Sequence, residues 1–309
     1  MSDSPSKFER SWQLFATSFR IIERNRKLLL FPVVSFAFTL VIVLFFVAPL
    51  FLLPTGHAWS DPEHWKAIVS RLGAVEPAAR GQERMVFSDT TYVCAALIYL
   101  VSMVCATFFN VAFYSEIMKA LRGGTVSVRS GLAFACQRIR SILMWSLFAG
   151  LVGLIIRGLE RRFGWFGRLV LGFVGMMWSV ASVFVIPVIV AKDDANPVDL
   201  LRTSAATLKR TWGESLIGYV GVAFASWILL AGTVVLFVAG FVVSALLGHP
   251  LLMVAFVAAW FVFLVAFSYV VGVANHIFRC ALYIYATEGA IPSPFTPEHL
   301  EGAWKTKKA

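Results

Sequence analysis

The sequence predicts an all-α integral membrane protein, and three observations lead to this prediction. Of its 309 residues, 59% are hydrophobic and only 14% are charged, whereas soluble domains are near a quarter charged. Six stretches lack charged side chains, and basic residues cluster beside them. Amphipathic segments with helical periodicity precede several of these stretches. We therefore treat residues 1–309 as a single integral membrane domain.

The uncharged stretches predict six transmembrane helices, at about 28–53, 90–115, 141–156, 169–191, 215–247 and 251–275. About 20 apolar residues suffice to cross the hydrocarbon core, so the first two stretches are long enough. The third holds only 16 residues between Arg140 and Arg157, which is short unless both arginines snorkel outward. The fifth is so long that it must tilt, bend or protrude. We expect Gly123 and Gly289 to end the helices of the second and sixth spans.

Three segments ahead of spans one, three and five favour amphipathic helices on the cytoplasmic membrane surface. In the first, 5–26, the residues Phe8, Trp12, Phe15, Phe19 and Ile22 recur at spacings of three and four. The third begins at a capping Asn196 and is expected to end at Gly213. Basic side chains on these segments are expected to contact the headgroups of anionic phospholipids: Arg20, Arg24, Arg26, Lys27, Arg138, Arg140, Lys209 and Arg210.

The spacing of these segments indicates three copies of one unit, an interfacial helix followed by a helical hairpin, at 4–115, 125–191 and 196–287. Sequence identity among the three is negligible, so ordinary amphipathic segments ahead of spans are the alternative explanation. Between spans one and two lies the outer loop 54–89. Within this loop, Asp61 and Gly73 are expected to bound a short amphipathic helix.

Lysine and arginine counts predict that both chain ends are cytoplasmic. With this orientation the inner segments carry 19 basic residues and the outer segments 8. The exception is the outer segment 157–168, which holds four arginines. Together with the short third span, these arginines leave an alternative in which spans three and four form a re-entrant hairpin and four helices cross.

Four stretches resemble a known family: RSWQLFATSFRIIERNRKLLLFPVVS, FFNVAFYSEIMKALRGG, NPVDLLRTSAATLKRTWGESL and ALYIYATEGAIPSPF. The chain resembles an uncharacterised family of prokaryotic six-span integral membrane proteins, a domain of unknown function. More loosely, it is similar to the membrane domains of some glycerophosphoryl diester phosphodiesterases, although it lacks their soluble catalytic domain. The resemblance implies a multi-pass protein of a prokaryotic plasma (inner) membrane and no particular activity.

Motifs for catalysis and cofactors are sparse. Walker, Rossmann, HExxH and Gly-x-Ser-x-Gly patterns do not occur, so we predict no cofactor. The nearest approach to a metal site is His57, Asp61, Glu63 and His64, which we interpret as ordinary loop residues. Basic residues adjoin hydrophobic spans instead of interleaving with exposed aromatics, so nucleic acid is not an expected partner.

Polar residues near the cytoplasmic ends of spans two and six are the candidate functional site. They are Asn110, Tyr114, Glu116, Asn275, His276 and Arg279. Polar groups at such depths are costly unless partnered or hydrated. We expect Glu116 to pair with Arg279 and Asn110 to face Asn275, lining a cavity that opens toward the cytoplasm. The simpler interpretation is an ion pair that locks two helices together.

These observations favour a non-enzymatic membrane protein, either a transport or permeation body or a scaffold that holds anionic lipid. The alternative is an intramembrane enzyme acting on lipids. Besides the lipid bilayer, a homo-oligomeric partner remains compatible with the sequence.

Overall fold

The computed structural model of the chain describes residues 7–52, 54–78, 82–163, 165–192, 196–246, 248 and 250–295. Residues 5 and 6 of the first predicted amphipathic segment lie outside this part, as do residues 53, 79–81 and 247 and the side chains of Phe8, Trp12 and Phe15. Within the described part, helices account for nearly all regular structure, beside one small β-hairpin. The predicted all-α class is confirmed in this respect.

The elements follow one another along the chain as α1 (Lys7–Arg24), the 3-10 helix η1 (Arg26–Leu29), α2 (Leu30–Leu52), α3 (Pro62–Leu72), β1 (Gly73–Ala78), β2 (Gln82–Phe87), α4 (Asp89–Leu121), α5 (Val128–Gln137), α6 (Ile139–Arg162), α7 (Trp165–Ala181), α8 (Val185–Ala191), α9 (Pro197–Leu246) and α10 (Pro250–Glu288). Gly123 follows the end of α4 and Gly289 the end of α10, with φ of +82° and +65°. Glycine adopts this left-handed conformation without steric cost, so both helices end where the sequence predicts.

Five helices in the described part are long and apolar enough to cross a membrane, and the chain is accordingly a multi-pass membrane protein. They cover Arg26–Ala48, Asp89–Leu121, Ile139–Glu160, Leu169–Ala191 and Leu251–Glu288. The remaining predicted span lies in α9. There Leu230–Ser244 forms a shorter apolar stretch, and the side chains of 211–229 lie outside the described part.

Two helices continue past boundaries expected from the sequence. The prediction that Gly213 ends a helix is wrong, because α9 runs unbroken for 50 residues. One glycine inside a helix costs only about 1 kcal/mol, which the turns on either side can outweigh. Helix α6 has 24 residues and includes both Arg140 and Arg157. Its length of about 36 Å exceeds a hydrocarbon core of about 30 Å. The third span is therefore long enough to cross, and its length does not support the alternative of a re-entrant hairpin.

The predicted fourth span is broken near its C-terminal end. Residues 182–184 separate α7 from α8, and Pro187 follows them in α8. Proline has no N–H, and its ring clashes with the carbonyl four residues earlier, so the break falls where the sequence cannot complete the helical ladder. The hydroxyl of Ser204, from α9, accepts the N–H of Phe184 at 3.0 Å and donates to the carbonyl of Ala181 at 2.6 Å. One buried side chain thus bonds the backbone on both sides of the break.

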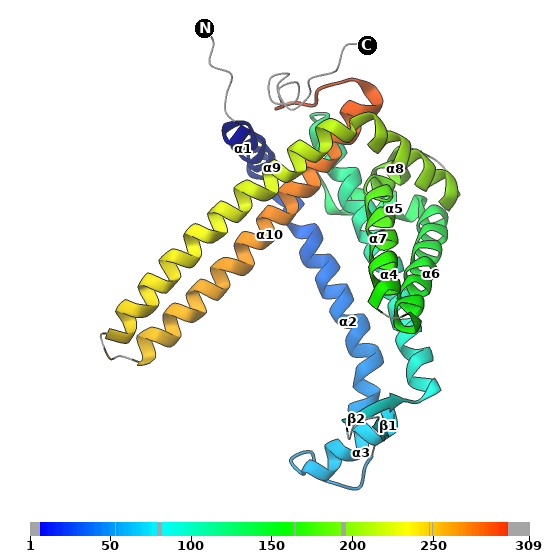
Figure 1. Cartoon of the computed structure of the whole chain (residues 1–309). Helices are drawn as coiled ribbons and strands as arrows, with labels where there is room; N and C mark the ends of the chain where they lie inside the picture. The colour runs from blue at the N-terminus through cyan, green and yellow to red at the C-terminus, as the bar shows by residue number, and fades with distance from the viewer. Residues whose placement is uncertain are drawn as a thin grey trace.

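The helices converge at one end of the molecule and diverge toward the other (Figure 1). At the convergent end, α4 contacts α2, α5, α6, α8 and α10, while α1 lies against α9 and α10. The buried apolar core lies there and includes Leu28, Val111, Ile142, Val188 and Ile277. Away from it, the α9–α10 hairpin separates from α2 and from α6 and α7, and large apolar side chains of these arms are exposed.

The outer loop forms a small folded unit at the divergent end. Helix α3 begins as predicted, with the Asp61 carboxylate accepting the N–H of Glu63. A hairpin that the sequence analysis missed follows it, in which β1 pairs antiparallel with β2. This unit and the convergent end, where α1 begins and α10 ends, lie at opposite ends of the molecule (Figure 1).

Candidate functional site

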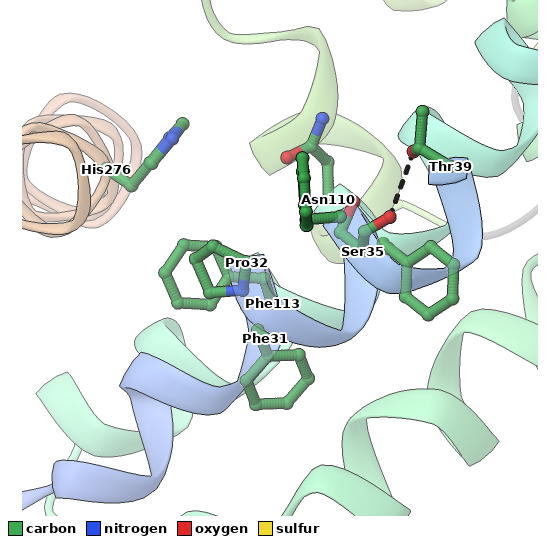
Figure 2. A pocket seen from close by; sticks show the side chains of 9 residues that line it. Phe31, Pro32, Ser35, Thr39, Asn110, Phe113 and His276 are labelled. Carbon is green, nitrogen blue, oxygen red and sulfur yellow. Dashed lines mark hydrogen bonds between the residues drawn. The ribbon is translucent and has the colours of Figure 1, made fainter. Parts of the chain in front are cut away.

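A hollow of about 250 Å³ lies between α2, α4 and α10, beside the core of the convergent end, to which its lining residues Phe31 and Phe113 belong. Helix α2 contributes Phe31, Pro32, Ser35, Phe36 and Thr39; α4 contributes Phe109, Asn110 and Phe113; and α10 contributes His276. Figure 2 shows these side chains around the hollow, with the Thr39 hydroxyl donating to the Ser35 carbonyl at 2.9 Å. The lining is mainly aromatic, with a few polar groups and no charged side chain.

Aromatic packing holds the three helices around this hollow. Phe31 of α2 stacks on Phe113 of α4, with ring centroids 5.5 Å apart. Phe113 in turn meets the His276 ring edge to face at 5.5 Å. The Tyr269 hydroxyl of α10 also donates to the backbone carbonyl of Leu29 in η1. These contacts place α10 beside the start of α2 although the two are more than 200 positions apart in the chain.

Three of the predicted polar residues form a chain of hydrogen bonds behind the hollow. Arg279 donates from Nη1 to the Tyr114 hydroxyl oxygen at 3.2 Å. That hydroxyl lies 2.8 Å from Nδ1 of His276. Two tautomers of His276 are compatible with this contact; in the one that accepts the Tyr114 hydroxyl hydrogen at Nδ1, Nε2 carries the ring hydrogen. The chain fixes the orientation of His276 at the wall of the hollow.

The predicted pair of asparagines is not brought together as expected. Asn110 lines the hollow, but Asn275 does not, and the α10 residue that shares the hollow with Asn110 is His276. Residues 275 and 276 are neighbours on a helix and point in directions about 100° apart, so only one of them can face α2 and α4. The prediction that α4 and α10 approach each other is thus confirmed, but the α10 residue that lines the hollow with Asn110 is His276 and not Asn275.

The predicted ion pair between Glu116 and Arg279 is also wrong. Glu116 is 2% exposed, and its carboxylate accepts the N–H of Ser127 at 2.8 Å and the hydroxyl of Ser130 at 2.5 Å. Lys119 approaches the same carboxylate at 3.8 Å. The loop 122–127 turns the N-terminus of α5 back onto α4, and the carboxylate lies at the positive end of that helix.

Close contact between α4 and α5 explains why Glu116 finds its partners there. A Cβ atom at Gly131 of α5 would lie 2.8 Å from the Ala112 carbonyl oxygen and 2.9 Å from the Phe31 ring. Only glycine fits in this space. The Glu116 cluster therefore joins two consecutive helices and lies apart from the hydrogen-bonded chain of Arg279.

Seven of the eight basic residues predicted to contact lipid headgroups are exposed: Arg20, Arg24, Arg26, Lys27, Arg140, Lys209 and Arg210. The eighth, Arg138, is half-buried, with its guanidinium 5.3 Å from the centroid of the Phe134 ring. Among the described side chains of α1, from residue 16 onward, Thr17, Ser18, Ile21 and Ile22 are buried, while Phe19 of the predicted stripe is exposed. Of the two stripe residues whose side chains are described, Ile22 thus lies in the protein core and Phe19 at the molecular surface.

The loop residues considered for a metal site take part in other contacts. Nδ1 of the buried His64 lies 2.5 Å from the Thr55 hydroxyl, and its ring stacks on Trp59. His57 lies 3.5 Å from Asp61, which also caps α3. Within the described ranges no group of three or more His, Cys, Asp or Glu side chains is arranged to hold a metal ion.

The hollow itself was not predicted as a whole. The polar residues that α2 contributes, Ser35 and Thr39, lie four positions apart and therefore on one face of the helix. This spacing could have indicated a polar face on span one. The aromatic members resemble the other phenylalanines of the spans, so nothing in their pattern distinguishes them. Their role depends on the approach of α10, which a sequence pattern does not reveal.

Residues 89–292 of the chain match a protein family described as a family of unknown function, DUF6159. No curated protein and no solved structure matches the chain.

Proposed function

Because the chain belongs to the family of unknown function DUF6159, its activity has to be inferred from its own geometry, and we propose that it is a non-enzymatic lipid-holding scaffold. In this proposal it resides in the plasma (inner) membrane of a prokaryote, crosses six times and keeps both chain ends in the cytoplasm. Its exposed basic residues bind anionic phospholipids there.

The observation that supports a scaffold most is the uneven distribution of packing along the helices. Among the described residues, the large hydrophobic core cluster lies at the convergent end, where seven of the eight predicted headgroup-binding residues are exposed. Beyond it, the arms separate and expose phenylalanine, leucine and valine side chains. A permeation pathway requires helices that enclose a route across the whole membrane, whereas diverging arms admit lipid between them.

The orientation and the internal repeat belong to the same proposal. An inside location of the convergent end agrees with the excess of lysine and arginine in the segments 1–27, 116–140, 192–214 and 276–309. Three units follow the order of the elements: α1 with α2 and α4, α5 with α6 to α8, and the first turns of α9 with the rest of α9 and α10. The fifth predicted span, which brings the number of crossings to six, is then the apolar stretch of α9.

Anionic lipid binding is tested with the purified full-length protein in nanodiscs that contain phosphatidylglycerol and phosphatidylcholine. Native mass spectrometry measures the preference for the anionic lipid. The double variant Arg26→Gln/Lys27→Gln should lose about 2 kcal/mol of that preference, because each basic side chain near an anionic surface contributes about 1 kcal/mol. The matched control, Lys66→Gln/Arg71→Gln, removes two exposed charges from α3, at the opposite end of the molecule from Arg26 and Lys27, and should change little. An equal effect of both variants contradicts the proposal.

Two further outcomes would favour the other candidate functions. Solute flux through proteoliposomes that disappears in Asn110→Leu would indicate a permeation body. Turnover of a lipid by the purified protein, lost in His276→Ala, would indicate an enzyme. The scaffold proposal predicts neither flux nor turnover.

A further inference from the structure

We infer that the hollow between α2, α4 and α10 binds the ester region of one glycerolipid from the cytoplasmic leaflet. This inference rests on the proposed scaffold function and adds a specific site to it, distinct from the basic surface. The glycerol backbone and its ester carbonyls occupy the hollow. The acyl chains leave it along the exposed apolar face of α2.

The wall of the hollow supplies hydrogen-bond donors for a ligand. The Asn110 amide lies in the wall of the hollow and bonds to no other described residue. In the tautomer of His276 that accepts from Tyr114 at Nδ1, the Nε2–H is left for a ligand. Figure 2 shows Asn110 and His276 entering the hollow from different helices. Unpartnered donors in an apolar surrounding are costly, so an acceptor bound between them is favoured.

The lining of the hollow carries no charged side chain. Five apolar and four neutral polar side chains surround the hollow, so an anionic group bound there would remain uncompensated. A neutral carbonyl oxygen accepts hydrogen bonds without this penalty. An ester carbonyl therefore fits the hollow better than a phosphate or a carboxylate, and the phosphate belongs at the basic residues near the membrane surface.

The depth and the volume of the hollow also suit the ester region of a lipid. Arg26 and Lys27 precede Phe31 by about one helical turn, and Thr39 lies about 12 Å further along α2. The hollow thus lies between the charged surface and the apolar arms, at the level where glycerol esters join acyl chains. Its 250 Å³ is less than a complete drug-sized ligand requires, which is about 300 Å³ or more, and it suits only the polar middle of a lipid.

The route for the acyl chains is visible on α2. Phe36 lines the hollow and is 69% exposed, and Leu40 and Leu44 continue the exposed apolar surface on the same side of the helix. A water-soluble solute would gain nothing from this surface. An amphiphile gains both the donors and the apolar contact.

The test compares two lipids that differ only in the acceptors. Full-length protein in detergent is titrated with a diacyl phosphatidylglycerol and with its dialkyl ether analogue, which lacks the ester carbonyls, and the rise in melting temperature reports binding. We expect the ether lipid to bind roughly five- to thirtyfold more weakly, since one or two neutral hydrogen bonds are lost. Equal binding of the two lipids would overturn the inference.

Variants locate the effect. Asn110→Leu should abolish most of the difference between the ester and ether lipids, whereas Asn275→Leu, the same change one position outside the lining, should retain it. The melting temperature without lipid shows that each variant is folded. If Asn110→Leu unfolds, His276→Gln, which keeps a donor, and His276→Leu, which does not, provide the same comparison.

The outcomes separate this site from the basic surface. The Arg26→Gln/Lys27→Gln variant should lose the preference for an anionic headgroup and retain the preference for esters. If the charge variant loses its preference while Asn110→Leu changes nothing, the scaffold proposal stands and the ester site is refuted. If the wild type shows no preference for an anionic headgroup but both the wild type and the charge variant prefer the ester lipid, the ester site stands and the binding of anionic lipid by the basic residues is refuted.

Discussion

Glu116 shows how burial changes the role of a charged residue near a membrane. A carboxylate is tolerated in the core only when hydrogen bonds replace its hydration. Here the replacements are the Ser127 N–H, the Ser130 hydroxyl and the positive end of α5, with Lys119 nearby. Each of these partners comes from within 14 positions of Glu116. The residue therefore stabilises a local joint between α4 and α5 and does not serve the hollow.

Replacing this carboxylate should reduce stability far more than replacing an exposed one. Glu116→Gln turns one acceptor oxygen into a donor that faces the Ser127 N–H or the Ser130 hydroxyl, and it should cost about 1.5–3 kcal/mol. The control Glu288→Gln breaks an exposed salt bridge with Arg122 and should cost no more than about 1 kcal/mol. Thermal denaturation in detergent measures both. A larger loss for Glu288→Gln would contradict the role assigned to Glu116.

At the level of elements, the break between α7 and α8 depends on a side chain from a different helix. Unpaired backbone groups within a membrane cost several kcal/mol each, so a broken span needs partners for its freed N–H and C=O groups. Ser204 provides both bonds from the first turns of α9. The first turns of α9 are therefore held against the broken span by polar as well as apolar contacts.

Removing the Ser204 hydroxyl should loosen this attachment. Ser204→Ala leaves the Phe184 N–H and the Ala181 carbonyl without their partner and should cost about 1–3 kcal/mol. Ser179→Ala is the matched control, because the exposed Ser179 hydroxyl bonds only to the Gly175 carbonyl of its own helix. Hydrogen exchange of the 178–188 backbone should accelerate in the first variant alone. Unchanged exchange in Ser204→Ala would show that the break does not depend on this contact.

For the whole molecule, the convergent and divergent ends differ in both packing and charge. The core, the end of α10 and most basic segments share one end, and the folded outer loop lies at the other. If the convergent end is cytoplasmic, as proposed, every interfacial segment lies on the same leaflet. The turn between α6 and α7 then reaches the outer side, in spite of its arginines.

Labelling of single cysteines in intact cells tests this orientation. In a variant with the four native cysteines replaced, Ser60→Cys in the outer loop should react with a membrane-impermeant maleimide, whereas Arg129→Cys in α5 should react only after permeabilisation. Phe163→Cys, in the exposed turn after α6, should react from outside if α6 and α7 cross completely. Labelling of Phe163→Cys only from inside would instead support the re-entrant hairpin with four crossing helices.

Much of the helical architecture could be predicted because it depends on short-range properties. Uncharged runs of sufficient length mark membrane helices. The Asp61 carboxylate begins a helix by accepting a nearby backbone N–H, and Gly123 and Gly289 end helices through their own backbone conformation. The prediction that Gly213 ends a helix failed because short-range properties alone do not end a helix. A glycine permits a helix to end but does not require it when neighbouring turns and tertiary contacts continue the helix.

Partner choice, in contrast, depends on how distant helices approach each other. The predicted topology placed Tyr114, His276 and Arg279 near the same ends of spans two and six, and hydrogen bonds join these three in the structure. The partners predicted for Glu116 and Asn275 were wrong, because Glu116 bonds to the start of the following helix and Asn275 lies one position away from the hollow. A rotation of about 100° between adjacent helical positions decides which side chain faces a neighbour, and packing sets that rotation. Hydrophobicity along the chain therefore specifies that this protein enters the membrane as helices, while the packing of α10 against α2 and α4 creates its hollow.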